Sequence, residues 1–138
     1  MADWTGMSRS NYFQVKDPDT FRKFMDTFPS VEIYNDLKDR PNAFCLVAED
    51  GSWPSWRFES RGDDLGEEVE VDFIREVAPH IADGEVAVFI TVGFEKARYG
   101  TGYAIAINNA GSFVEQDIDA IYDKALGAFG IKPSPAQY

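Results

Sequence analysis

Cysteine and histidine are almost absent from this sequence, since each occurs once in 138 residues. One cysteine excludes an internal disulfide and a thiolate metal cluster. Cys45 lies in the apolar run 43–47, so we expect a buried, inert thiol. One histidine, His80, excludes a histidine-rich transition-metal site, and any nucleophile–histidine pair would have to use it. His80 falls near the end of a predicted helix, where the helix dipole favours the imidazolium, and we assign it a structural role.

Basic residues are also scarce. Lysine and arginine total 13 against 24 aspartates and glutamates, which gives a formal charge of -11 and a pI near 4.4. Such a charge repels nucleic acid and anionic membranes, so we expect no direct binding to either. The N-terminus has no apolar targeting segment, and no apolar run approaches the length that spans a bilayer. We therefore expect a cytoplasmic protein.

Apolar and aromatic residues are plentiful, at 44% and 14% of the chain, and indicate a well-packed globule. The stretch 85–109 alternates large branched residues with smaller ones in two runs, which predicts two strands of an antiparallel sheet. One face of this hairpin is large and branched, and the other is mostly small. A face of small residues leaves room for a helix to lie close, so both faces of the sheet could be covered.

Three helices are predicted from capping residues and apolar stripes. The first begins after Asp17, the second spans about 73–81, and Asp117 caps the third. Pro79 removes a backbone donor and should kink or shorten the second helix. The residues expected to point from these helices into the core are Phe21, Phe24, Ile74, Val77, Ile121 and Leu126.

The fold class that follows is α+β: a single domain, residues 1–138, of mainly antiparallel sheet with about five to seven strands and three helices in the order β-α-β-β-β-α-β-β-α. We expect residues 1–9 to form a loose arm and 131–138 a flexible tail. Residues 31–59 are predicted to form a three-stranded meander, and 112–115 a last short strand.

Acidic residues concentrate in the segment 59–72, which holds seven acids and one base. Its glycines suggest a mobile loop. The alternating ligand pattern of a calcium loop is missing, so the segment is either a solvated loop or a patch that attracts a basic partner. Trp53 and Trp56 lie just before it and favour a core role, although an exposed tryptophan there would anchor an interface. The candidate partner-binding residues are Asp63, Asp64, Glu67, Glu68, Glu70, Trp53 and Trp56.

Catalytic and cofactor-binding motifs are missing from the sequence. The glycines near Lys96 and Arg98 fit no phosphate-binding pattern and are better interpreted as hairpin glycines. We therefore expect no enzymatic activity, no metal and no organic cofactor. An alternative is a small hydrolase or transferase that uses Glu95 with Tyr99 or Tyr103.

Two segments carry a resemblance: YFQVKD with F..FM near the start, and DFI.E.AP.IADGEVAVF..VG.EK.RYG.GYA.A.N later. Over roughly residues 11–126 the chain resembles small acidic proteins encoded on bacterial plasmids, prophages and other mobile elements. Some proteins from that setting are anti-CRISPR or antirestriction proteins, which bind a host nuclease complex and in some cases imitate the charge of DNA.

The resemblance implies a stoichiometric inhibitor of a host protein with a basic surface, with an anti-CRISPR protein as its sharpest version. An immunity protein or antitoxin that neutralises a basic toxin would share the same features. Two other contact surfaces also stay open, namely the edge strand 112–115 and the acidic positions Asp117, Asp119 and Asp123.

Overall fold

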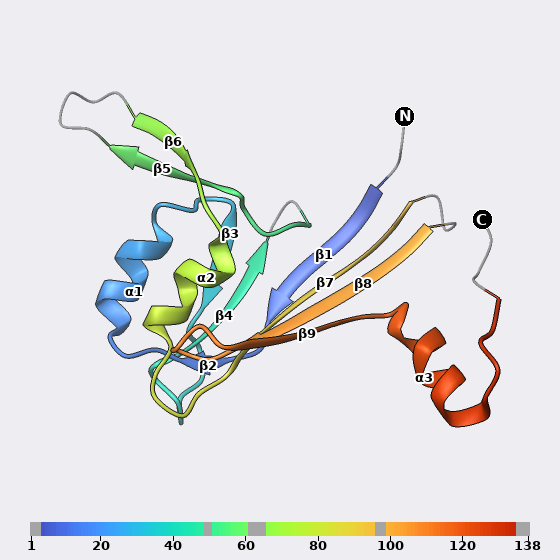
Figure 1. The fold of residues 1–138 in the computed structure, drawn as a ribbon. Helices are drawn as coiled ribbons and strands as arrows, with labels where there is room; N and C mark the ends of the chain where they lie inside the picture. The colour runs from blue at the N-terminus through green and yellow to red at the C-terminus, as the bar shows by residue number, and fades with distance from the viewer. Residues whose placement is uncertain (1–3, 49–50, 61–65, 96–98, 135–138) are drawn as a thin grey trace.

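The computed structural model describes residues 4–48, 51–60, 66–95 and 99–134. Its frame is a seven-stranded antiparallel sheet, and α1 and α2 pack on one face of it (Figure 1). The predicted α+β class and the three helices are confirmed. The strands of this sheet are β1 (Trp4–Ser10), β2 (Phe13–Gln14), β3 (Val31–Tyr34), β4 (Ala43–Ala48), β7 (Ala87–Glu95), β8 (Tyr99–Ile107) and β9 (Phe113–Asp117).

Two further strands, β5 (Trp56–Ser60) and β6 (Gly66–Glu70), form a separate antiparallel ribbon. The helices are α1 (Pro18–Met25), α2 (Phe73–Val77) and α3 (Ala120–Phe129). A short 3-10 turn, Ala78–His80, follows α2 directly, so Pro79 shortens the second helix as expected.

The sheet runs in the order β3, β4, β1, β7, β8, β9, with the short β2 beside β4. The prediction of a loose arm over residues 1–9 is wrong for residues 4–9, because β1 lies between β4 and β7 at the centre of the sheet, and residues 1–3 lie outside the described residues. Its inward side chains are polar. Ser8 is fully buried, donates a hydrogen bond to the Gly51 carbonyl at 2.9 Å and lies 2.9 Å from the Thr91 hydroxyl. These contacts satisfy its hydroxyl, which makes a buried serine tolerable.

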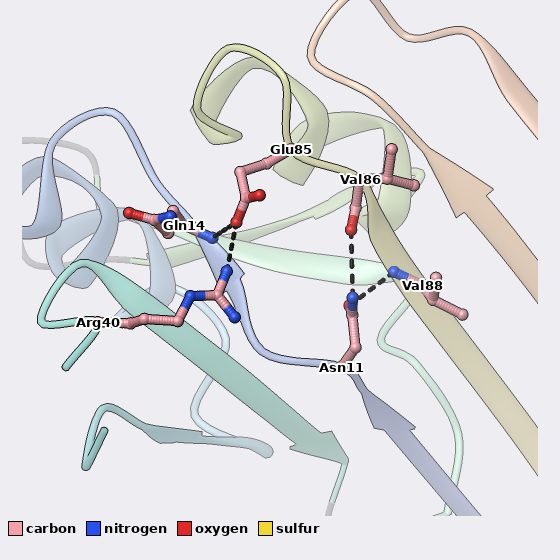
Figure 2. Close-up of polar contacts among 6 residues, drawn as sticks. All are labelled: Asn11, Gln14, Arg40, Glu85, Val86 and Val88. Atoms are coloured by element: carbon pink, nitrogen blue, oxygen red, sulfur yellow. Dashed lines mark hydrogen bonds and ion pairs between the residues drawn. The ribbon is translucent and has the colours of Figure 1, made fainter. Parts of the chain in front are cut away.

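Asn11 lies between β1 and β2, and its side chain is hydrogen-bonded to the backbone at the start of β7 (Figure 2). Its side-chain amide donates to the Val86 carbonyl at 3.2 Å, and its side-chain oxygen accepts from the Val88 amide at 2.8 Å. Nearby, Glu85 accepts from the backbone amide of Gln14 at 2.9 Å and pairs with Arg40 at 2.7 Å. These polar groups bind one another and stabilise the bend.

The core lies between the sheet and the first two helices and is rich in phenylalanine. Phe21 of α1 is fully buried and meets the Phe44 ring of β4 edge-on, with 5.1 Å between centroids. Asp17 caps α1 as predicted, because its carboxylate accepts from the amides of Asp19 and Thr20. In α2, Val77 is fully buried, and Ile74 packs against the core from a half-buried position.

The expected meander over residues 31–59 forms only in part. Strands β3 and β4 pair, but β5 leaves the sheet and pairs with β6 instead. Residues 66–70, which we expected to lie in a mobile loop, are therefore strand. The short last strand at 112–115 appears as the edge strand β9.

The third helix differs most from expectation. None of its residues is buried, so Ile121 and Leu126 do not enter the core as predicted. Its N-cap residue is Asp119 rather than Asp117, although the Asp117 carboxylate still accepts from the Ala120 amide at 3.0 Å. Figure 1 shows α3 to the side of the sheet, beyond the end of β9. Of the expected flexible tail, 131–134 is irregular and exposed, and 135–138 lies outside the described residues.

Candidate functional site

The β5–β6 ribbon stands apart from the seven-stranded sheet and reaches beyond α1 and α2 (Figure 1). At its base the strand pairing continues by one step, because the Val71 amide donates to the Ser55 carbonyl at 2.8 Å. Arg57 of β5 forms an ion pair with Glu76 of α2 and so connects the ribbon to the body. An isolated two-stranded hairpin is marginally stable in water, so this ion pair matters for holding the ribbon in place.

The ribbon gathers several of the predicted partner-binding residues. Glu67, Glu68 and Glu70 belong to β6, and the register places Glu67 opposite Glu59 and Glu70 opposite Trp56. Trp56 is 53% exposed, and Glu70 is also exposed. The remaining candidates, Asp63 and Asp64, lie outside the described residues.

Trp53 lies elsewhere and has a different role. Its ring stacks on Phe73 with 5.6 Å between centroids and meets Phe89 edge-on at 5.1 Å. It is half-buried against the core, and its indole nitrogen is buried with no hydrogen-bond partner among the described residues. Of the two tryptophans, Trp56 is therefore the one whose side chain is open to a partner.

A second acidic surface surrounds Tyr103 on β8. An open depression of about 520 Å³ there is lined by Tyr103, Glu115, Gln116, Asp117, Asp119, Ala120 and Asp123. The Tyr103 hydroxyl donates to Glu115 of β9, which stands diagonally across the β8–β9 pair. No sequence pattern pointed to this contact, because it depends on the β8–β9 register.

The hydrogen bond to Glu115, followed by burial and the negative charge of that carboxylate, raises the pKa of Tyr103 to about 12. Tyr103 therefore stays protonated at neutral pH and is a poor general base. The other members of the alternative catalytic set, Glu95 and Tyr99, have side chains outside the described residues. The described residues around Tyr103 form a polar, negatively charged surface.

His80 lies beside two aromatic rings of α1. Its imidazole stacks on Phe24 with 4.5 Å between centroids and meets Phe21 edge-on at 5.6 Å. Burial, and secondarily the charge of Lys16, lowers the pKa of His80. The expectation that the helix dipole would favour the imidazolium is thus wrong, because desolvation outweighs it. The imidazole is a half-buried ring packed against the phenylalanines of α1.

Metal-binding groups of three or more histidine, cysteine, aspartate or glutamate side chains do not occur among the described residues. Cys45 is buried, and its thiol donates to the Ser10 carbonyl at 3.2 Å. None of the helices in the described ranges is long and apolar enough to cross a bilayer.

Comparisons with models of known protein families, with curated proteins and with solved structures find no match. The function is therefore argued from the surfaces of this molecule.

Proposed function

We propose that the chain is a stoichiometric protein-binding inhibitor that engages a basic surface of a host protein through the β5–β6 ribbon. The observation that carries the proposal is the position of this ribbon. It projects from the body, presents an exposed tryptophan beside β6, and concentrates acidic residues in a segment that contributes to no sheet but its own.

The chemistry of the ribbon supports a basic partner. Between Trp56 and Glu70 the sequence holds six acids and two bases, Arg57 and Arg61. Arg57 pairs with Glu76 at the base of the ribbon, so its charge is compensated there. Clustered negative charge accelerates association with a positive surface, and tryptophan is enriched among the residues that contribute most to binding.

The most specific form of this proposal is an anti-CRISPR protein whose ribbon occupies a lysine- and arginine-lined nucleic-acid channel of a CRISPR effector. This version rests on the resemblance to small acidic proteins of mobile elements. A plaque or transformation assay tests it in hosts with and without each CRISPR type. Protection restricted to one type is the expected result. Equal efficiency in every host would refute the anti-CRISPR version and favour an immunity protein or antitoxin.

The contact surface is tested by reversing charges at the ribbon. The triple variant Glu67→Lys, Glu68→Lys, Glu70→Lys should lose most of its inhibition and much of its salt dependence. A single ion pair on a protein surface contributes only about 0.2–1 kcal/mol and weakens as salt rises, so three charges are changed together. A control with the same charge change, Asp26→Lys, Asp39→Lys, Asp83→Lys, alters exposed acids outside the ribbon and outside the acidic surface around Tyr103, and should keep its inhibition. Equal inhibition and equal salt slopes for both folded variants would exclude the ribbon as the contact site.

A further inference from the structure

The face of the sheet opposite α1 and α2 is exposed and largely apolar over β1, β7, β8 and β9. Strand register places its side chains on one surface, because Met7 pairs with Val92, Ile90 with Ala104, and Ala106 with Val114. We call this surface the outer face, and its residues are Thr5, Met7, Arg9, Val88, Ile90, Val92, Phe94, Gly100, Gly102, Ala104, Ala106, Val114 and Gln116. The β9 residue Val114 is 72% exposed, so the apolar surface extends to the edge of the sheet.

The middle of the outer face is a shallow groove along β8. Small residues form its floor, since Gly102, Ala104 and Ala106 lie on this side of the strand. Two adjoining depressions of about 240 and 350 Å³ share Ala106 and Val114 in their linings. One end of the groove is already filled by the chain itself: a Cβ atom on Gly102 would lie 2.7 Å from Cγ2 of Ile118. The groove is thus shaped to accept branched apolar side chains.

The helix that follows Ile118 carries a matching ridge. Ile118, Ile121, Ala125 and Phe129 recur at spacings of three and four, so they share one side of α3 and of the turn before it. Phe129 is 77% exposed and Ile121 is 61% exposed. The helix has 10 residues and is about 15 Å long, and it fits along β8, whose 9 residues span about 30 Å.

Most of the exposed large apolar residues in the described part of the chain lie either on the outer face or in residues 118–131, with exposures of 36–77%. Apolar residues gathered in this way, rather than scattered singly, are typical of a surface that another protein covers.

The outer face can accept a second copy of this acidic chain. The chain has 24 acidic residues, yet none belongs to the outer face, and Glu32 on the same side of the sheet lies on β3, two strands beyond β1. Two copies with a net charge of -11 each can therefore meet here without burying a carboxylate. A basic partner, by contrast, would meet Arg9 at the border of this surface and no opposite charge.

We propose that two copies of this chain associate through this face, with α3 of each copy lying in the β8 groove of the other. Each chain supplies one helix and one groove, so a twofold arrangement closes and leaves neither exposed. The proposal does not depend on the function of the ribbon, which lies outside the outer face.

Sedimentation velocity of the full chain over about 1–100 µM tests the association. The expected species has twice the 15.5 kDa mass of the chain. Ala106→Arg in the groove and Ile121→Asp on α3 should each weaken dimerisation by about tenfold or more. Trp56→Arg, which changes an exposed apolar residue outside this face, should leave it unchanged. A monomeric wild-type protein across the whole range would overturn the proposal.

Mixing the two variants tests the placement of α3. Each variant alone should be monomeric. In a heterodimer, the unaltered α3 of the Ala106→Arg chain meets the unaltered groove of the Ile121→Asp chain. At the second contact, the introduced arginine faces the introduced aspartate. A heterodimer is therefore expected only in the mixture. A mixture that stays monomeric, or an Ile121→Asp variant that dimerises like wild type, would overturn the exchange of α3. The Ile121→Asp change should not prevent folding, since no residue of α3 is buried.

Discussion

Replacing Gly102 by alanine tests the contact between the end of β8 and Ile118. The added Cβ would lie 2.7 Å from Cγ2 of Ile118. Optimal carbon–carbon separations are about 3.5–4.0 Å, so the overlap approaches ~1 Å. This methyl group can move aside only if Ile118 changes its χ1 rotamer or its backbone shifts, and a β-branched side chain is stiff at χ1. Overpacking of this kind typically costs about 1–3 kcal/mol.

The same change also removes a glycine from a strand, which by itself stabilises by roughly 0.5–1 kcal/mol. We therefore expect Gly102→Ala to destabilise the protein by about 0–2.5 kcal/mol. In an Ile118→Ala background the overlap disappears, and the same change should become stabilising. The coupling between the two positions should be about 1–3 kcal/mol.

Urea denaturation at one fixed protein concentration measures all four members of this cycle. Gly100→Ala is the matched control, because Gly100 belongs to the same strand and face and a Cβ there would meet nothing within 4 Å. It should stabilise in either background. If Gly102→Ala and Gly100→Ala had the same effect with Ile118 intact, the contact would not exist as described.

Two further predictions concern the core. Phe21→Ala should lower the free energy of unfolding by about 3–5 kcal/mol, whereas Trp56→Ala should change it by no more than about 0.5 kcal/mol. Urea denaturation measures both, and similar losses for the two variants would contradict the burial of Phe21. Because the folded-state pKa of His80 lies below its ordinary value of 6.5, its contribution to stability is present above pH 6.5 and declines as the pH falls through 6.5 towards the folded-state pKa. The His80→Phe variant should therefore lose less stability than wild type between pH 7.5 and 5.5, and equal losses would show that His80 does not titrate abnormally.

The elements with strong apolar periodicity could be predicted from sequence. The β7–β8 hairpin alternates with period two, and α1 combines a capping aspartate with a phenylalanine stripe, so local pattern and tertiary role agree in both. β1 has no such pattern. Its buried side chains include Ser8 and Ser10, and burial of a hydroxyl depends on hydrogen bonds to residues far along the chain.

The pairing of elements was harder to predict than their existence. Alternation indicates that residues 56–60 form a strand, but it does not say whether the strand joins β4 or the acidic segment that follows. Likewise, the stripe on α3 predicts an amphipathic helix without specifying what covers it. For the candidate site, charge clustering pointed to 59–72, but only the fold separates Trp56 from the core-packed Trp53.

The central position of β1 has a consequence for synthesis of the chain. Its register joins Trp4 to Glu95 and Ser10 to Phe89, so the first strand is translated long before its main partner. At roughly 5–20 residues per second, the ribosome reaches β7 on the order of 5–20 s after β1. During that interval β1 has exposed backbone donors and acceptors on the side that β7 later covers. The seven-stranded sheet can close only late in translation, and a nascent chain stalled before β7 would expose an edge prone to aggregation.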